Sequence, residues 1–251
     1  MYSTSDLVQS IVKHNELRFL LNIHAGVNIN GLGQMQHICM TPLEASIKFH
    51  NDFAFYKLIE MGADIHSTVS GNPALMEAAT SDDNLHYVEV LINKGADVNY
   101  SDYDGFTPLM EATICNCPKI IKRLIDAGAD PNTHNRYMKS PLNYAIKYGH
   151  MESLRTLVAC GADIEYTPTL EKHPLYYSVE KNNAEALRYL IECGGNMNFL
   201  KEWDFEKNIM DIAISYYSLE CVQVLLDYGI KPTIMNNITV KVIEDARNLS
   251  R

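Results

Sequence analysis

The sequence predicts an all-α solenoid of stacked helix-turn-helix repeats that are joined by β-hairpin loops. Three observations predict it: a tripeptide that recurs at a fixed spacing, a helix-start signal with the same spacing, and two apolar helical faces between them. A period of roughly 20 to 50 residues decides an architecture, because each repeat buries its apolar surface only against its neighbours. We therefore expect residues 1–251 to form a single domain.

The recurring tripeptide is Gly-Ala-Asp. Copies 33 residues apart begin at Gly62, Gly95, Gly128 and Gly161, and Gly194 continues the spacing. Glycine adopts, without steric cost, the left-handed backbone conformation that ends many helices. Each of these glycines is therefore expected to follow the end of a helix and to open a turn-rich loop.

The helix-start signal is a Ser or Thr followed by Pro-Leu. It occurs at Thr41, Thr107 and Ser140, and His173 takes the same place in a later repeat. A hydroxyl oxygen can accept a backbone N–H bond at a helix start, and Pro is tolerated in the first turn. Each repeat is therefore expected to begin a helix here, with the Leu 19 or 20 residues before the Gly.

Apolar spacing predicts two helices in each repeat. Leu142 and Ile146 mark one helical face, and Leu154 and Leu157 mark another, with the break at Gly149 between them. Apolar residues three and four apart lie on one side of a helix, whereas Gly interrupts the pattern. A helix-turn-helix pair is therefore expected in each repeat.

This arrangement resembles the ankyrin-repeat family, whose 33-residue repeat combines a β-turn with two helices and a Thr-Pro-Leu-His signature. Residues 102–109 form the fullest copy. The chain departs from the family pattern where the loop Gly is replaced by Met138, Glu171 or Glu206, so these hairpins are expected to be irregular. The resemblance implies repeats at residues 36–67, 68–101, 102–134, 135–167, 168–202 and 203–235, after a capping unit at 1–35 and before a capping helix within 236–251.

The two ends are expected to cap the solenoid, because terminal repeats need a polar outer face. Residues 7–13 and 17–23 predict two helices at the start of the chain. Residues 239–249 predict one amphipathic helix at the other end, with Val240 and Ile243 turned inward.

The charge composition disfavours nucleic acid and membrane surfaces as partners. The chain has 21 Lys and Arg against 31 Asp and Glu, a net charge of −10. Nucleic-acid affinity comes largely from Lys and Arg that displace counterions. The sequence also lacks a stretch of roughly 20 apolar residues, a leader and a lipidation motif. We expect a cytoplasmic protein, in the host cytosol if a pathogen produces it, and a monomer when free.

The sequence shows no motif of a common enzyme class. The segment from Gly31 to Gly33 lacks the third Gly of a dinucleotide site, and the six cysteines lack paired Cys-x-x-Cys spacing. Cys160 and Cys193 are one repeat apart, too far for a disulfide. We therefore expect no catalytic residue, no metal and no cofactor. Two alternatives remain: an enzyme with a site on residues 31–39 or at the Cys115 turn, and an inert spacer that assembles with itself.

By the family resemblance, partner contacts are expected beside the loop Gly and near the end of the first helix, and these positions are unusually aromatic. Tyr, Trp and Arg dominate binding hot spots, because they bury much area with few rotatable bonds. The expected contact residues are Tyr103, Asp104, Phe106, Arg136, Tyr137, Lys139, Tyr148, Trp203, Phe205 and Tyr216. Alternatively, Trp203 and Phe205 fold back to fill a lengthened segment.

The resulting hypothesis is a non-catalytic module that binds a partner protein on the concave face of the solenoid. It would act as an adaptor, a scaffold or a masking inhibitor, and a virus, an intracellular bacterium or a eukaryote could encode it. The many Asn, Ile, Tyr and Lys residues indicate an AT-rich genome, in which viral or intracellular-bacterial effectors with such repeats are common. Acidic neighbours such as Asp102 and Glu111 favour a basic partner segment. Asn99 and Asn132 resemble hairpin asparagines that hydroxylases modify; alternatively, they close the hairpins through side-chain hydrogen bonds.

Overall fold

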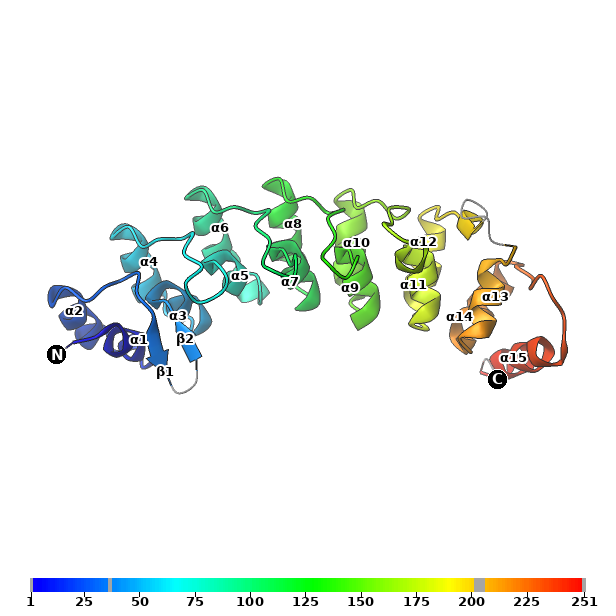
Figure 1. The fold of residues 1–251 in the computed structure, drawn as a ribbon, viewed down its shortest axis with the longest axis horizontal. Helices are drawn as coiled ribbons and strands as arrows, with labels where there is room; N and C mark the ends of the chain where they lie inside the picture. The colour runs from blue at the N-terminus through cyan, green and yellow to red at the C-terminus, as the bar shows by residue number, and fades with distance from the viewer. Residues whose placement is uncertain (1, 36–37, 201–205, 250–251) are drawn as a thin grey trace. The chain divides into compact units, whose positions relative to one another are not determined.

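The structure, a computed structural model, describes residues 2–35, 38–200 and 206–249 and consists mainly of short helices (Figure 1). The chain divides into two compact units, Met1–Ala129 and Asp130–Arg251, here called unit 1 and unit 2. In the part of the chain that the structure describes, no helix combines the length and the apolar character needed to cross a bilayer.

Unit 1 is a stack of helix pairs. Its elements are α1 (Thr4–Val12), α2 (Glu16–His24), β1 (Gly33–Met35), β2 (Ile38–Met40), α3 (Pro42–Lys48), α4 (Asp52–Glu60), α5 (Ala74–Ala78), η1 (Asp82–Asn84), α6 (Leu85–Asn93), α7 (Pro108–Ile114) and α8 (Pro118–Asp126). The first helices of successive pairs contact one another, α1 with α3, α3 with α5 and α5 with α7. Figure 1 shows α4, α6 and α8 along the opposite side of this unit.

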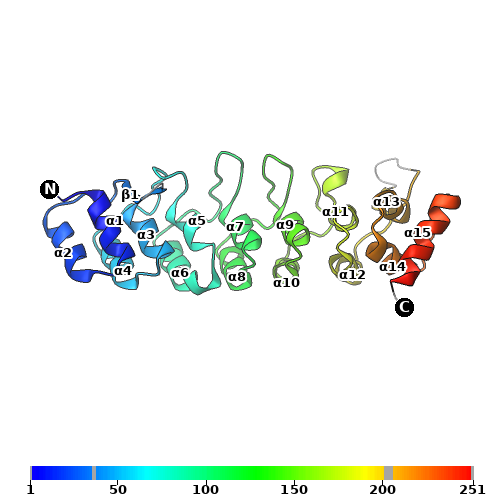
Figure 2. The same cartoon turned by 90° about the horizontal axis from the view of Figure 1, so that it is seen from below.

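Unit 2 repeats the same arrangement. Its elements are α9 (Pro141–Tyr148), α10 (Met151–Ala159), η2 (Leu170–Lys172), α11 (Pro174–Glu180), α12 (Ala184–Glu192), α13 (Ile209–Ser215), α14 (Leu219–Asp227) and α15 (Asn237–Asn248). Here α9 contacts α11 and α11 contacts α13, while α10, α12 and α14 form the second row and α15 packs on α14. The loops before α9 and α11 project on the same side of these helices (Figure 2).

We call the first helix of each pair the inner helix and the second the outer helix. The inner face of a unit is the side formed by its inner helices and the loops that precede them. The core lies between the two rows, where leucines of both rows are at most 2% exposed. In unit 1 they are Leu43, Leu75 and Leu109 on inner helices and Leu58, Leu91 and Leu124 on outer helices.

The predicted helix starts are confirmed. The hydroxyl oxygens of Thr41, Thr107 and Ser140 each accept the backbone N–H of the residue three positions on, at 3.2–3.3 Å. A Pro follows each of them in the first turn. His173 caps α11 in the same way, since its Nδ1 accepts the N–H of Leu175 at 3.3 Å.

The predicted helix ends are confirmed as well. Gly62, Gly95, Gly128 and Gly161 have φ between 78° and 95°, in the left-handed region. Each lies two residues beyond the last residue of an outer helix. The recurring tripeptide therefore marks matching helix ends, as its spacing predicts.

The long first loop contains the short antiparallel hairpin of β1 and β2, in which Gly33 pairs with Met40. Strand β1 packs on α1. A Cβ atom on Gly33 would lie 2.4 Å from Val8 Cγ2 and 2.8 Å from the Thr4 carbonyl oxygen. Only glycine fits at this close approach, so the second glycine of the Gly31–Gly33 segment is explained by packing.

Two local expectations are wrong. The loop at Met138 is regular: the Asn135 N–H donates to the Lys139 carbonyl at 3.1 Å, and Met138 itself takes the left-handed φ of 56°. In the last helix, Val240 is 40% exposed, and Val242 is buried in its place, 3% exposed. The loop at Glu171 is irregular, as expected, because it forms η2.

Candidate partner-binding surface

The predicted contact residues fall into two groups. Tyr103, Asp104 and Phe106 lie in the loop before α7 of unit 1. Trp203 and Phe205 lie outside the described residues. The other five belong to unit 2: Arg136, Tyr137, Lys139, Tyr148 and Tyr216.

The loop of unit 1 is held by one carboxylate. Asp102 Oδ1 accepts the N–H of Asp104 at 2.9 Å and that of Phe106 at 2.8 Å. The Asp102 N–H in turn donates to the Phe106 carbonyl at 3.0 Å, which closes the loop. This fixed loop leaves Tyr103 81% exposed. Tyr103 is therefore presented to solvent on an ordered backbone.

The side-chain amide of Asn135 fixes the equivalent loop in unit 2. Asn135 Oδ1 accepts the N–H of Tyr137 at 3.0 Å and that of Lys139 at 3.2 Å, while Asn135 Nδ2 donates to the Tyr144 hydroxyl at 2.7 Å. Asn135 is buried, so these bonds are shielded from water. Tyr137 is 57% exposed, whereas the Lys139 ammonium group lies over the ring of Tyr144 on the inner helix α9.

Lys139 lies among residues that were not predicted as contact residues from the sequence. Its Nζ is 5.9 Å from the ring centroids of both Tyr144 and Tyr177. Lys172 Nζ lies 5.6 Å and Lys181 Nζ 5.1 Å from the Tyr177 ring. These distances are within the range of cation–π attraction. Three ammonium groups therefore surround one buried ring.

Tyr148 extends this cluster along α9. Its ring stacks on that of Tyr144 with centroids 6.3 Å apart, and Lys147 Nζ lies 4.5 Å from its centroid. Tyr148 is 45% exposed. We call the following set the Lys–Tyr cluster: Lys139, Tyr144, Lys147, Tyr148, Lys172, Tyr177 and Lys181.

Tyr216, at the end of α13, has an aromatic partner on the preceding inner helix α11. Its ring meets that of Tyr176 edge to face, with centroids 6.2 Å apart and hydroxyl oxygens 3.3 Å apart. Tyr216 is 47% exposed. Because Tyr176 and Tyr177 are neighbours on α11, this pair continues the tyrosine-rich inner face of unit 2.

The repeat spacing held a signal for the missed residues. Tyr144 and Tyr177 are 33 residues apart, as are Lys139 and Lys172. A residue on an inner helix therefore has an equivalent in each neighbouring repeat. We call such a set of equivalent positions a column of the repeat; two columns contain these four residues. The same columns hold Phe106 and Glu111 in unit 1, where the chemistry differs.

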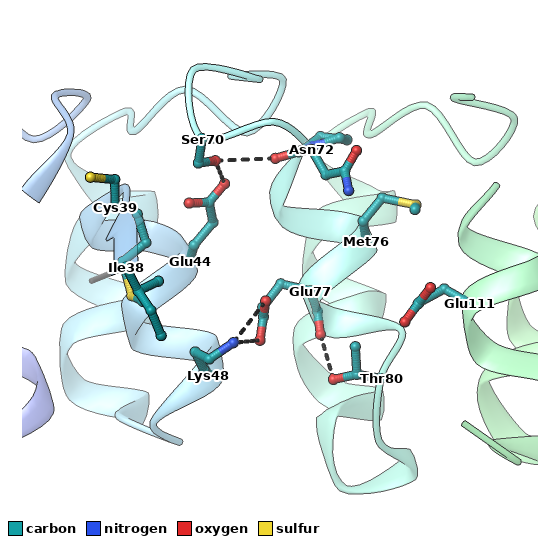
Figure 3. Close-up of a pocket in the computed structure, with 12 residues that line it drawn as sticks. Ile38, Cys39, Glu44, Lys48, Ser70, Asn72, Met76, Glu77, Thr80 and Glu111 are labelled. Atoms are coloured by element: carbon teal, nitrogen blue, oxygen red, sulfur yellow. Dashed lines mark hydrogen bonds and ion pairs between the residues drawn. The ribbon is translucent and has the colours of Figure 1, made fainter. Parts of the chain in front are cut away.

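The inner face of unit 1 contains an acidic pocket of about 280 Å³ between β2, α3, α5 and Glu111 of α7 (Figure 3). Glu44, Glu77 and Glu111 line it, with Lys48 Nζ 3.2 Å from Glu77 Oε1. Burial raises the pKa of Glu44, although hydrogen bonds from Ser70 and Thr41 act in the opposite direction. Burial also raises the pKa of Glu111. The pocket thus suits a group that donates hydrogen bonds or carries positive charge.

Three of the cysteines, Cys115, Cys117 and Cys221, are poor nucleophiles. Burial, then the charge of Glu111, raises the pKa of the Cys115 thiol, and burial raises the pKa of both Cys117 and Cys221 to about 12. The thiolate is the reactive form, so the Cys115 turn lacks an activated nucleophile. All six cysteines are free thiols. Among the described residues, no three His, Cys, Asp or Glu side chains form a group that could hold a metal ion.

The two hairpin asparagines connect neighbouring repeats within their units. Asn99 Nδ2 donates to the Gly128 carbonyl at 2.9 Å in unit 1. Asn132 Oδ1 accepts the N–H of Asp163 at 2.8 Å in unit 2. These bonds give both side chains a structural role at the hairpins.

Comparisons with known proteins agree with this architecture. The family model described as ankyrin repeats (3 copies) matches residues 43–135, 104–168 and 142–236. A protein of Fowlpox virus (strain NVSL) named as ankyrin repeat protein FPV031 is 38% identical over 79 residues, which are 31% of this chain and 23% of the viral protein. The crystal structure of the human ASB11 ankyrin repeat domain has a TM-score of 0.68 at 22% identity, over 84% of this chain and 98% of that one.

The family match covers well over half of the chain, and the helix pairs, capped starts and glycine-marked ends repeat as that family requires. The chain therefore belongs to the ankyrin-repeat family.

Proposed function

We propose that this chain is a non-catalytic module that holds a partner protein against the inner faces of its units. Ankyrin repeats are general protein–protein interaction modules. The observation that carries the proposal is the set of exposed tyrosines on the inner-face loops and helices. Tyr103, Tyr137 and Tyr148 are 81%, 57% and 45% exposed.

The ordered loops that carry Tyr103 and Tyr137 support a binding role. Asp102 and Asn135 fix the backbone of their loops through pairs of hydrogen bonds. A preordered loop loses less conformational freedom when a partner binds, so more of the contact energy appears as affinity. Aromatic side chains on such loops are well suited to form hot spots.

The acidic pocket supports a basic segment as the group that unit 1 recognises. An Arg or Lys side chain would pair with Glu44 or Glu111 there, and complementary charge would speed the encounter. Binding at this pocket is expected to weaken as salt increases, because screening shortens the range of the attraction.

Such a module would act as an adaptor, a scaffold or an inhibitor that masks its partner, and it would be a monomer when free. We propose a viral or intracellular-bacterial effector that works in the host cytosol, and the similarity to a fowlpox virus protein favours the viral source. The aligned region spans 23% of that viral protein.

Affinity purification with matched variants tests the proposal. The tagged chain is expressed in host cells, and its partners are quantified by mass spectrometry for the wild type, Tyr103→Ala/Tyr137→Ala and Tyr56→Ala. Tyr56 lies on the outer helix α4 and is 48% exposed, so it controls for the loss of a tyrosine. The double variant should lose the specific partner, whereas Tyr56→Ala should retain it. An unchanged partner set for the double variant would refute the proposal.

A further inference from the structure

Four ammonium groups gather on the inner face of unit 2, in a chain whose net charge is −10. They belong to Lys139 before α9, Lys147 near its end, Lys172 before α11 and Lys181 just after it. All four lie between 4.5 and 5.9 Å from tyrosine rings of the Lys–Tyr cluster. The fold thus concentrates positive charge that the composition does not reveal.

The protein neutralises little of this charge itself. Lys181 pairs with Glu180 at 2.5 Å, and Lys147 donates to the Tyr148 hydroxyl at 3.0 Å. Within the described part of the chain, Lys139 and Lys172 form no ion pair within 4.0 Å. Burial, then the charges of Lys147, Lys172 and Lys181, lower the pKa of Lys139, while Glu180 acts in the opposite direction. The lysines therefore repel one another, and a bound anion would relieve that repulsion.

The Tyr177 hydroxyl adds a second, independent observation. Tyr177 is 1% exposed, and its hydroxyl has no hydrogen-bond partner among the described residues. A buried polar group without a partner costs free energy. At the middle of the cluster, the Tyr177 hydroxyl thus lacks a hydrogen-bond partner, and the nearby Lys139 and Lys172 lack a carboxylate partner, within the part of the chain that the structure describes.

The position of the lysines defines what could bind. Lys172 and Lys181 flank α11, which has seven residues and so spans about 10 Å. An extended peptide covers that length with about three residues. Carboxylates two or three positions apart on such a segment would reach ammonium groups at both ends of the helix.

We propose that the inner face of unit 2 binds an acidic segment of a partner protein, with its carboxylates paired to Lys139, Lys172 and Lys181 and its apolar groups against the ring of Tyr148. This inference rests on the proposed protein-binding function and deepens it for unit 2. For unit 2 we thus expect an acidic partner segment, whereas the charges of unit 1 favour a basic one.

An acidic peptide fits the charges better than a nucleic acid does. Lysines with stacking rings also occur in single-strand binding proteins, but those proteins follow the phosphate backbone along an extended basic groove. Here four lysines gather in the cluster, whereas unit 2 as a whole carries 16 acidic against 13 basic side chains. A short acidic segment would contact only the Lys–Tyr cluster, whereas a long polyanion would also approach the acidic side chains of the unit.

Fluorescence anisotropy on the full chain tests the inference. The probes are a fluorescein-labelled peptide of repeating Glu-Leu-Gly, the matching Gln and Lys peptides, and an oligouridylate of similar contour length. We expect the Glu peptide to bind about tenfold more tightly than either matched peptide. Lys139→Gln/Lys172→Gln should weaken its binding about tenfold, as expected for the loss of two ion pairs. The control Lys231→Gln/Lys241→Gln removes two exposed lysines of unit 2 outside the cluster and should bind as the wild type does.

Three results would overturn the inference: equal binding of the Glu and Gln peptides, equal loss in the two double variants, or tighter binding of the oligouridylate. Circular dichroism verifies that each variant is folded. The partner captured by affinity purification separates this inference from the proposed function. A partner that depends on Tyr103 and Tyr137 but binds Lys139→Gln/Lys172→Gln normally would leave the proposed function intact and refute the acidic segment.

Discussion

Tyr144 and Tyr177 occupy equivalent places on successive inner helices, yet their hydroxyl groups differ. The Tyr144 hydroxyl accepts a hydrogen bond from Asn135 at 2.7 Å, whereas the Tyr177 hydroxyl is buried without a partner among the described residues. Burying a polar group is costly unless its hydrogen bonds are made. One tyrosine hydroxyl therefore contributes to stability, and the other opposes it.

Replacing each tyrosine by phenylalanine should change stability in opposite directions. Tyr177→Phe removes an unsatisfied hydroxyl and should raise the free energy of unfolding by about 1 kcal/mol. Tyr144→Phe leaves the buried Asn135 amide without its acceptor and should lower it by about 1 to 3 kcal/mol. Urea denaturation measures both changes. A loss of stability in both variants would show that the Tyr177 hydroxyl is satisfied in solution.

Glu111 occupies the same column of the repeat in unit 1, and its chemistry predicts a pH effect. Burial, with smaller contributions from Glu77 and Asp102, raises its pKa in the folded state. The folded chain thus retains the proton to a higher pH than the unfolded chain does. Stability contributed by this group is present below the ordinary carboxyl pKa and is lost as the pH rises through the folded-state pKa.

Glu111→Gln should therefore increase stability at neutral pH and flatten the fall in unfolding free energy as the pH rises above the ordinary carboxyl pKa. Denaturation curves over this pH range test the prediction. Glu89→Gln, at an exposed site on α6, is the matched control. A pH profile of Glu111→Gln that parallels that of the wild type would contradict the assignment.

Among the elements, the loops before α7 and α9 share one geometry in spite of different residues. Their left-handed residues are Gly105, with φ of 81°, and Met138, with φ of 56°. Side-chain oxygens of Asp102 and Asn135 hold the two loops through matching backbone hydrogen bonds. These bonds outweigh the strain at Met138, which is why the missing glycine did not make the loop irregular.

That strain can be measured with two substitutions at one position. A non-glycine residue in the left-handed region costs about 1–2 kcal/mol, and glycine costs about 0.5–1 kcal/mol in chain entropy. Met138→Gly should therefore stabilise the chain by about 0.5 to 1 kcal/mol, whereas Met138→Ala keeps the Cβ and should not. Equal effects of the two substitutions on unfolding would rule out backbone strain as the cause.

The helices were predictable because their signals are local. Hydroxyl caps, Pro in the first turn and glycine-marked ends act within a few residues, so Thr107 and Gly128 were placed correctly from sequence alone. The burial of Val242 instead of Val240 depends on how α15 packs against α14. That packing is a tertiary property, and the sequence pattern of one short helix did not determine it.

For the molecule as a whole, the repeat spacing predicts the architecture but not the distribution of charge. Lys139, Lys147, Lys172 and Lys181 are spread over more than 40 residues of sequence, and the stacking of α9 on α11 brings them to one group of tyrosine rings. Tyr148 and Lys139 were predicted as contact residues from the sequence, whereas their neighbours Tyr144 and Tyr177 were not. Reading the columns of the repeat recovers them, because equivalent residues of adjacent repeats are neighbours in space.

The proposed function requires the inner faces, and not the outer helices, to hold the partner. Hydrogen–deuterium exchange of the chain with and without the partner captured by affinity purification tests this claim directly. We expect slower amide exchange on binding in residues 102–106 and 135–139 and in the inner helices α9 and α11, with unchanged exchange in the outer helices α4, α8 and α12. Slower exchange confined to the outer helices would contradict the claim.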